Sequence, residues 1–411
     1  MSGLLIAGEG AFYSRDTRKT QRNNHVLVCG ASGTGKTRHV VGPNIAEAND
    51  SYVVVDPKGT LYGQYAPFLS ERGYEIKKLN FANPGDRDGS GWNPFTGLLT
   101  DQDVLTFASA LVAACGQRSI DPFWDQTSKI FYGALIAYLF HYTTSECHNL
   151  RSLHKLIRMA STDEHDRSEK ASLDYLMEDV RRTDPDSYCL KLYDTYRLSA
   201  GRTLCSIQIS TAAHSAIFDT DELDYLLSGP GISLPSIGMR KTALFVTISD
   251  MDRSLDPLVS LFFTQLFQSL VRLADGRPDG RLPVPTMLIL DDFATNVVIP
   301  DFAAMISSLR SRELSVMVII QDETQLQVRY GVEAHAIISN CDTYIFLGTG
   351  DIETAEKIAK RAGVPLADIM SMGIGEMWIF RRGERPLKTV RIQIKDKDTE
   401  PARKVTHLQA P

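Results

Sequence analysis

The most constraining feature of the sequence is the stretch GASGTGKT, which spans Gly30–Thr37 and fits the phosphate-loop pattern G-x-x-x-x-G-K-[ST]. A short apolar run, His25–Gly30, precedes it and predicts a buried strand, and a helix is expected from Thr37. The glycines let consecutive backbone N–H groups curl around the β-phosphate of a nucleotide at the start of that helix. This order of strand, loop and helix predicts a P-loop nucleotide-binding fold.

The residues of this loop have separate expected roles. Lys36 is expected to reach the β- and γ-phosphates of ATP, and the Thr37 hydroxyl is expected to ligate Mg²⁺. The residues expected to bind the nucleotide are Gly30, Ala31, Ser32, Gly33, Thr34, Gly35, Lys36 and Thr37. The predicted cofactors are therefore ATP and Mg²⁺. The competing interpretation is a glycine-rich turn that binds no ligand.

An acidic motif in the second half of the chain has the form that a P-loop requires. In MLILDD, four apolar residues lead directly into Asp291 and Asp292. We expect Asp291 to lie on the metal side of the site and Asp292 to polarise the attacking water, a role that hydrolytic motors more often give to Glu. A paired acidic strand end beside a loop, without catalytic function, is the alternative.

Three further polar residues follow this motif. Gln321 ends the next apolar run and is interpreted as a sensor of the γ-phosphate or its water, although a surface glutamine fits the same pattern. Arg310 and Arg312 lie between the two runs, on a predicted helix end. An arginine that reaches the nucleotide of a neighbouring subunit would stabilise charge in the transition state of phosphoryl transfer. Solvated arginines at a helix end are the alternative.

The segment DPKGTLY follows another predicted strand and brings Asp56 and Lys58 to the ligand-binding edge of the sheet. An ion pair or a turn explains these two residues equally well, so their role is left open. The histidines, including His39, lack the spacing of metal ligands and are interpreted as structural.

The arrangement of apolar runs predicts the fold class. Runs that predict buried strands alternate with helical segments, which is typical of a parallel sheet covered on both faces. These runs are His25–Gly30, Ser51–Asp56, Tyr74–Phe81, Thr242–Ser249, Thr286–Asp292, Leu314–Gln321 and Thr343–Gly348. Two short edge strands and a loose tail are expected from Glu376 onward.

Between these two groups of runs, Asp101–Leu227 shows helical periodicity and no convincing strand. We therefore predict an α/β nucleotide-binding domain of residues 1–97 and 236–411, interrupted by an all-helical domain of residues 98–235.

Composition limits the possible partners and locations. The formal net charge of −6 argues against a surface coated with phosphate-binding charge, so nucleic acid would have to bind to a local patch, pore or groove. No apolar run approaches the roughly 18–20 residues of a membrane span, and the N-terminus lacks a secretory pattern. The six cysteines include no CxxC pair. Together these features predict a soluble cytoplasmic chain with reduced thiols.

The order of motifs is more specific than the P-loop alone. GASGTGKTRHVVGPNI, SYVVVDPKGTLY, WNPF, DPFW, LILDDFAT, IIQDETQL and NCDTYIFLGTGDIETAEKIAKRAG follow one another along the chain. This series resembles the type IV secretion coupling proteins, the TraG/TraD-like ATPases of conjugation, and the resemblance covers roughly Gly8 to Arg391. It implies a RecA-like domain with an all-helical insertion between the two nucleotide motifs.

The resemblance also implies a function. It assigns Lys36 and Thr37 to ATP and Mg²⁺, Asp291 and Asp292 to the acidic motif, and Gln321 to the sensor. Arg310 falls where the family places an arginine that acts on a neighbouring subunit. The implied protein couples a relaxase–DNA complex to the secretion channel and drives single-stranded DNA into it as a hexameric ring, while the isolated chain could be a monomer.

Members of this family usually begin with two membrane-spanning helices, whereas this sequence starts close to the motor. Two explanations remain open: a shortened chain, or a variant held at the inner face of the cell membrane by a separate membrane anchor. Two alternative functions also remain open, a cytosolic translocase of double-stranded DNA and a recruitment adaptor that binds nucleotide without significant hydrolysis.

Overall fold

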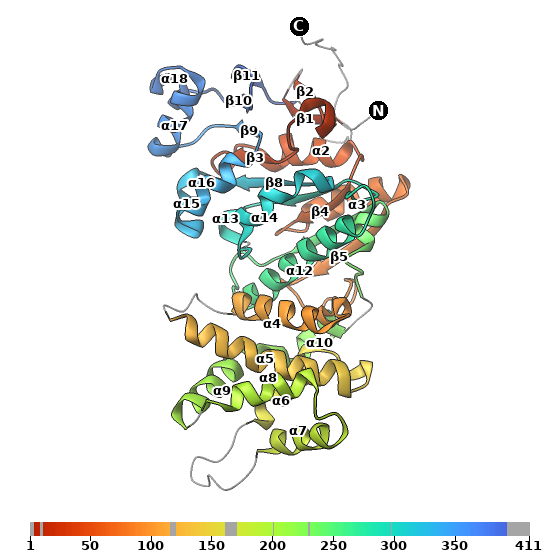
Figure 1. The fold of residues 1–411 in the computed structure, drawn as a ribbon. Helices are drawn as coiled ribbons and strands as arrows, with labels where there is room; N and C mark the ends of the chain where they lie inside the picture. Colours follow the sequence, from red (N-terminus) through yellow and green to blue (C-terminus); the bar gives the residue numbers. More distant parts are fainter. Residues whose placement is uncertain are drawn as a thin grey trace. The chain divides into compact units, whose positions relative to one another are not determined.

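The computed structural model describes residues 4–8, 11–115, 121–160, 171–199, 201–228, 231–296 and 298–392. The chain divides into two compact units, which are coloured by sequence in Figure 1. The nucleotide unit consists of Met1–Ala82, Leu234–Asp252 and Leu266–Pro411. The helical unit consists of Asn83–Ser233 and Arg253–Gln265.

A nine-stranded sheet forms the centre of the nucleotide unit, with the strand order β11-β10-β9-β3-β8-β7-β4-β6-β5. The strands are β3 (Val26–Cys29), β4 (Ser51–Val55), β5 (Glu75–Asn80), β6 (Thr242–Thr247), β7 (Thr286–Leu290), β8 (Leu314–Ile320), β9 (Thr343–Phe346), β10 (Glu376–Arg381) and β11 (Leu387–Val390). The seven strands from β9 to β5 pair in parallel, and β10 and β11 add an antiparallel edge. The predicted α/β fold with a mostly parallel sheet is confirmed, and so are the two edge strands. The tail expected after them lies outside the described residues.

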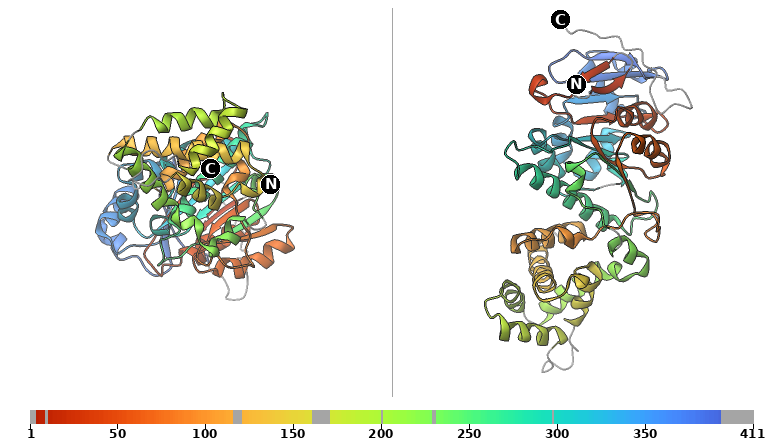
Figure 2. Two further views of the ribbon diagram at one scale, coloured as in Figure 1. Left: turned by 90° about the horizontal axis from the view of Figure 1, so that it is seen from below. Right: turned by 90° about the vertical axis from the view of Figure 1, so that its right-hand side faces the viewer.

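Helices cover both faces of this sheet because successive crossovers run in opposite directions along it. From β3 to β5 the chain moves toward one edge, and from β6 to β9 it moves back toward the other. With right-handed crossovers, the two sets of helices pack on opposite faces. The right-hand view of Figure 2 shows the red to red-orange helices of the nucleotide unit on one side of the strands and its teal helices on the other.

The helices of the first group are η1 (Thr37–Val41), α2 (Gly42–Ala46) and α3 (Thr60–Glu71). Buried side chains of α2 and α3, among them Ile45, Tyr65 and Leu69, share one core cluster with Val28 of β3 and Val54 of β4. The central strands β3, β4, β7, β8 and β9 are buried along their whole length. Strands of this kind read as continuous apolar runs, which is why the sequence identifies them.

The remaining helices of the nucleotide unit follow β7, β8 and β9, apart from one short helix before β3 and one before β6. They are α1 (Thr17–Thr20), α11 (Ser236–Met239), α13 (Phe293–Asn296), α14 (Phe302–Ser308), η5 (Arg310–Arg312), α15 (Glu323–Tyr330), α16 (Glu333–Ser339), α17 (Ile352–Ala362) and α18 (Leu366–Met370). An antiparallel hairpin, β1 (Leu4–Gly8) and β2 (Ala11–Ser14), precedes them. The sequence analysis did not anticipate this hairpin.

The helical unit contains no strand among its described residues. Its helices are η2 (Pro94–Gly97), α4 (Asp101–Cys115), α5 (Pro122–Tyr142), η3 (Ser145–Cys147), α6 (Leu150–Met159), α7 (Ser172–Thr183), α8 (Tyr188–Arg197), α9 (Arg202–Ser215), η4 (Ala216–Asp219) and α10 (Asp221–Ser228). Helix α5 lies at the centre and packs on α8, where the rings of Phe131 and Tyr196 stack with centroids 4.2 Å apart.

The helical unit takes in residues on both sides of the range 98–235 that the sequence suggests for the insertion. The fully buried Trp92 packs edge-on against Phe262, with ring centroids 5.2 Å apart, and its backbone N–H donates to the Leu226 carbonyl at 2.6 Å. The Gln265 amide donates to the Pro94 carbonyl at 3.1 Å. These long-range contacts place the WNPF motif inside the helical unit, a position that no local pattern indicates.

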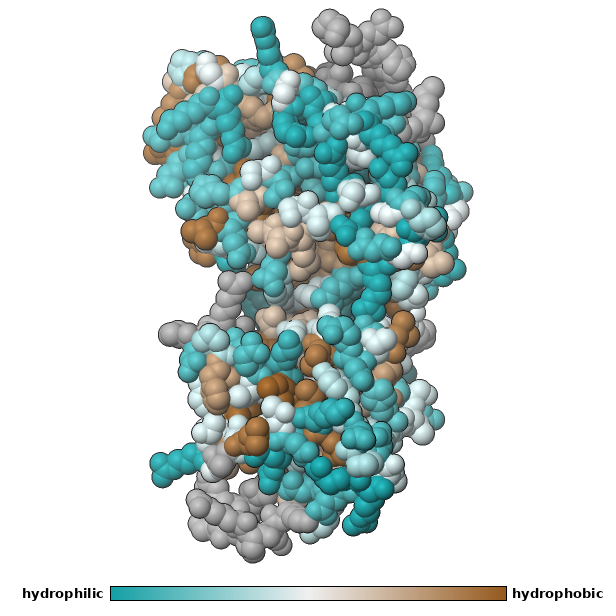
Figure 3. Space-filling model, in the orientation of Figure 1, coloured by the Kyte–Doolittle hydropathy of each residue, from teal (hydrophilic) through white to brown (hydrophobic). Residues whose placement is uncertain are grey.

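Helix α12 (Asp256–Asp275) is the single helix in the described ranges that is long and apolar enough to cross a membrane by length and composition. The sequence analysis found no such segment. Of its most apolar window, 61% is buried, as in the core helix of a soluble protein. The surface in Figure 3 is mostly hydrophilic, with separate apolar patches, several of them over the helical unit.

Candidate nucleotide-binding site

The phosphate loop leaves β3 at Cys29 and enters η1 at Thr37, so it lies at the carboxyl edge of the sheet. Gly33 and Gly35 both have φ of 77°, in the left-handed region that glycine enters without steric cost. The Ala31 N–H donates to the Gly348 carbonyl at 2.9 Å, which ties the loop to the end of β9. The helix expected after the loop begins with a π-helical turn and continues as α2.

Lys36 is folded back onto its own loop. Its ammonium group donates to the Gly30 carbonyl at 2.6 Å and to the Ala31 carbonyl at 3.2 Å, and the residue is buried. Both partners are neutral, so the positive charge has no counter-ion among these contacts. A lysine held in this way across a phosphate loop is available to an anion that displaces the carbonyls.

Thr37 and Asp291 meet at the same edge. The Thr37 hydroxyl donates to Asp291 Oδ2 at 2.9 Å, although the two residues are far apart in the sequence. Burial, and next the negative charge of Asp292, raise the pKa of Asp291 to about 6. A buried carboxylate beside a hydroxyl offers the oxygen ligands that Mg²⁺ prefers, and the bound cation would stabilise its charged form. The residues therefore fit a magnesium site.

Asp292 has a distorted backbone. Its φ of 47° lies in the left-handed region, which aspartate tolerates better than most residues but which still costs about 1 kcal/mol or more. Its N–H donates to Asp291 Oδ1 at 3.1 Å. Its own carboxylate is half-buried and has no hydrogen-bond partner within the described ranges. Strain of this kind is typical of functional positions, because the surrounding structure must hold it.

Gln321 follows β8 directly and lies beside the phosphate loop. Strands β3 and β8 pair in parallel with Cys29 opposite Ile320, and the Gly30 N–H donates to the Ile320 carbonyl at 3.2 Å. Strand β7, which ends before Asp291, pairs with the other edge of β8. The fold thus brings the loop, the acidic pair and Gln321 to neighbouring strand ends.

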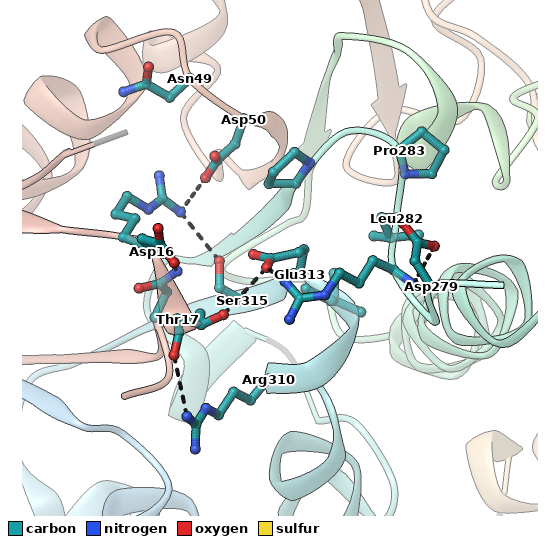
Figure 4. A pocket seen from close by; sticks show the side chains of 15 residues that line it. Asp16, Thr17, Asn49, Asp50, Asp279, Leu282, Pro283, Arg310, Glu313 and Ser315 are labelled. Atoms are coloured by element: carbon teal, nitrogen blue, oxygen red, sulfur yellow. Dashed lines mark hydrogen bonds and ion pairs between the residues drawn. The ribbon is translucent and has the colours of Figure 1, made fainter. Parts of the chain in front are cut away.

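Arg310 lies elsewhere. It precedes β8, at the amino edge of the sheet, and the seven residues of that strand separate the two edges by roughly 20 Å. Figure 4 shows its side chain directed at Thr17, whose carbonyl accepts a hydrogen bond from Arg310 Nη2 at 3.4 Å. The pocket drawn there has a volume of about 420 Å³ and is also lined by Asp50 and Glu313. Arg310 does not reach the phosphate loop of its own chain.

Three other residues that the sequence singles out lie in local structures: a helix start, a turn and an ion pair. Asp56 is buried and caps the start of α3, where its Oδ2 accepts from the Tyr62 N–H at 2.8 Å. Burial raises the pKa of Asp56, and the backbone N–H groups of α3 oppose that rise. Lys58 is exposed in the turn between β4 and α3. Arg312 forms an ion pair with Asp275, with Nε 2.7 Å from Oδ1.

Sequence reasoning missed two residues beside the loop. A Cβ atom added to Gly35 would lie 2.5 Å from Cδ2 of His39 and 3.5 Å from Nη1 of Arg391. The proximity of His39 to Gly35 follows from helical spacing, one turn along η1. Arg391 comes from the end of the described chain, and no local signal connects it with the loop.

Comparisons with known proteins agree with this arrangement. The sequence matches the family described as Type IV secretory system Conjugative DNA transfer over residues 2–371. No significant match is found among curated proteins. Similar solved structures include an unbound bacterial conjugative coupling protein, TrwBdeltaN70, with 20% identity, a TM-score of 0.71 and coverage of 95% of this chain and 88% of that one.

Two further structures extend the comparison. The plasmid coupling protein TrwB in complex with ADP and Mg²⁺ has 19% identity, a TM-score of 0.69 and coverage of 97% and 92%. VirB4 of Thermoanaerobacter pseudethanolicus has 15% identity, a TM-score of 0.58 and coverage of 96% and 97%. At these identities the likeness establishes the RecA-like P-loop fold alone, whereas the family match covers nearly the whole chain. The chain therefore belongs to the type IV secretory system conjugative DNA transfer family, which confirms the resemblance seen in its motifs.

Proposed function

We propose that the protein is a Mg²⁺-dependent ATPase that couples a relaxase–DNA complex to a conjugation channel and drives single-stranded DNA into it. The observation that carries this proposal is the hydrogen bond between Thr37 and Asp291, in the same loop as Lys36, whose ammonium group donates to loop carbonyls and forms no ion pair among the described residues. That contact joins the phosphate loop to the acidic motif in the arrangement that nucleotide hydrolysis requires. TrwB, which has the same fold, has been seen with ADP and Mg²⁺ and with a non-hydrolysable ATP analogue.

The chemistry follows from the positions of the groups. The loop N–H groups and Lys36 bind the β- and γ-phosphates, and Thr37 and Asp291 hold Mg²⁺, which supplies further charge neutralisation when it is bound. Asp292 accepts a proton from the attacking water. The new P–O bond forms at the γ-phosphorus as the bond to the bridging oxygen breaks, which gives ADP and phosphate. Gln321 orients the water or detects the loss of the γ-phosphate.

The position of Arg310 supports assembly into a ring. An arginine at the amino edge cannot stabilise charge at its own phosphate loop, but it can serve a neighbouring subunit. We therefore propose that hydrolysis occurs between subunits of a hexamer and that the isolated chain is weakly active. A channel component or a separate membrane anchor would concentrate the chain at the inner face of the cell membrane and favour assembly.

The helical unit is the proposed recognition module for the relaxase and its DNA. Phe123 and Trp124, at the start of α5, are 44% and 37% exposed and form an edge-to-face pair with centroids 5.3 Å apart. Exposed aromatic pairs are suited to binding a protein surface or stacking on unpaired bases. Replacing both by alanine should reduce DNA transfer and leave ATP binding unchanged.

An ATPase assay with and without DNA tests the proposal. Turnover stimulated by single-stranded DNA supports it, stimulation by duplex alone favours the cytosolic translocase, and no turnover in any state favours the adaptor. Asp292→Asn should lower turnover by roughly 10²–10⁴-fold while ADP still binds, because an amide cannot accept the proton. Wild-type turnover in Asp292→Asn would remove this residue from the mechanism.

A further inference from the structure

The segment that follows the last strand returns to the phosphate loop. Strand β11 pairs with β10, β10 pairs with β9, and β9 lies beside β3, from which the loop begins. Beyond β11, the Arg391 N–H donates to the Gly375 carbonyl at 2.8 Å. The Ile392 carbonyl lies 2.8 Å from His39 Nδ1, so this nitrogen carries the hydrogen. Hydrogen bonds therefore anchor the backbone at the Arg391 N–H and at the Ile392 carbonyl, before and after the Arg391 side chain.

The Arg391 side chain lies against the loop, and it forms no ion pair among the described residues. Its Nη1 is 3.5 Å from the position that a Cβ on Gly35 would occupy. Its Nε is buried and has no hydrogen-bond partner in the part of the chain that the structure describes. Burial lowers the pKa of Arg391, and no carboxylate in the described ranges offsets this effect. Arg391 as a whole is partly buried, but an Nε–H group that is buried without a partner is costly unless an acceptor completes the site.

We propose that Arg391 binds phosphate oxygens of the nucleotide held at Gly30–Thr37, and that it does so within its own chain. The inference rests on the proposed nucleotide-binding function and adds a residue to it. Phosphate is the favoured ligand for two reasons. Its negative charge neutralises the guanidinium, and two of its oxygens can accept hydrogen bonds from the paired N–H donors of the arginine. The contact lies beyond residue 371, where the family match ends. Arg391 and Arg310 thus have different proposed roles, one within a subunit and one between subunits.

Equilibrium titration of the full chain with ADP and with GDP, each with Mg²⁺, tests the inference. Arg391→Ala should weaken ADP binding by about tenfold or more, since a charge-assisted hydrogen bond is lost. The same factor is expected for GDP, because a phosphate contact does not distinguish the bases. Arg391→Lys should recover part of the affinity. Arg385→Ala, which removes an exposed arginine from the β10–β11 turn, is the matched control and should bind as the wild type does.

Several outcomes would overturn the inference. If Arg391→Ala binds nucleotide with wild-type affinity while Lys36→Ala binds it more weakly, the role of Arg391 is rejected and the proposed nucleotide-binding function stands. If Arg391→Ala weakens the binding of only one of the two nucleotides, ADP or GDP, then Arg391 contacts the base and not the phosphates. Arg391→Met keeps an aliphatic side chain at this position, so it serves as a second variant in case Arg391→Ala disturbs the β10–β11 hairpin. Its thermal unfolding without nucleotide should match that of the wild type. If wild-type protein binds neither nucleotide, the proposed function itself fails, and this inference fails with it.

Discussion

Charged side chains at the two edges of the central sheet have different kinds of partner. At the carboxyl edge, Lys36 contacts carbonyls and Asp291 contacts a hydroxyl, so neither charge is neutralised by a direct ion pair. At the amino edge, Arg15 forms a buried ion pair with Asp50, and Arg281 pairs with Glu313. The first edge is arranged for a ligand that brings its own charges, whereas the second is compensated within the fold.

Arg310 is the exception at the amino edge. Its hydrogen bond in the pocket of Figure 4 is to a neutral carbonyl, although acidic side chains line the same pocket. A cation kept out of the local ion pairs is available to a partner molecule. The comparison therefore separates three kinds of charge: those that we propose meet a ligand, those that form ion pairs within the fold, and Arg310, which we propose acts on another subunit.

The largest expected effect is at the carboxyl edge. Lys36→Ala should abolish ATP turnover, because the γ-phosphate loses its cationic contact in the transition state. The fold should survive, since the hydrogen bonds of this side chain to described residues are all to carbonyls of its own loop. Steady-state phosphate release measures the effect, and thermal unfolding checks the fold. Lys19→Ala, at an exposed lysine of the amino edge, is the control. If Lys36→Ala and Lys19→Ala hydrolyse ATP at the same rate, the proposed functional difference between the two edges of the sheet is wrong.

Arg310→Ala should lower turnover in the assembled state by about 10³–10⁵-fold without loss of nucleotide binding. Mixing this variant with Lys36→Ala should restore part of the activity, because some interfaces then contain both intact groups. Arg312→Ala removes the neighbouring arginine, which is already paired with Asp275, and should change turnover little. If mixed rings form and no activity returns, Arg310 does not act between subunits.

Arg15→Ala tests whether the amino edge serves stability. It leaves Asp50 buried without its partner, which should lower the free energy of unfolding by about 3–5 kcal/mol. Denaturant titration measures the loss, and ADP affinity of the folded fraction should not change. Arg277→Ala breaks a solvent-exposed pair with Asp279 and should cost less than about 1 kcal/mol. A change in ADP affinity with little loss of stability would contradict the comparison.

The smallest effect is a pH dependence. The raised pKa of Asp291 means that the folded state holds this proton more tightly than the unfolded state does. The resulting stability is complete below about pH 4 and is lost as the pH rises through about 6. Without Mg²⁺ and nucleotide, Asp291→Asn should therefore gain up to about 3 kcal/mol relative to wild type between pH 4 and 7.

Urea titrations across that pH range measure this difference, and Mg²⁺ with ADP should reduce it. Asp16 at the amino edge gives the opposite sign, because the Lys19 N–H lowers the pKa of Asp16. Its contribution is present above the unfolded pKa and is lost as the pH falls. A difference between Asp291→Asn and wild type that does not vary with pH would show that burial does not control this carboxyl.

The local elements could be predicted because they depend on neighbouring residues. The phosphate loop, the seven strand runs and the two edge strands follow from glycine spacing and apolar segments, and the order of motifs identified the family. The burial expected for Tyr74–Phe81 was wrong, because β5 lies at the edge of the sheet and is mostly only partly buried. Asp291, Asp292 and Gln321 could be placed at one edge because each follows a strand of a parallel sheet. The hairpin β1–β2 lacked such a signal, and the entry of WNPF into the helical unit depends on Trp92 meeting Phe262.

Tertiary structure decided which distant groups meet. Strand order brings Thr37 within 2.9 Å of Asp291 and separates Arg310 from the loop by the length of β8. It turned Asp56 into a helix cap and carried Arg391 back to Gly35. The physical reason is that a sequence pattern reports on residues within a few positions, whereas strand pairing and chain reversal join residues hundreds of positions apart. The sequence alone determined the nucleotide-binding fold and the family, and the packed sheet determined which charged groups lie next to one another.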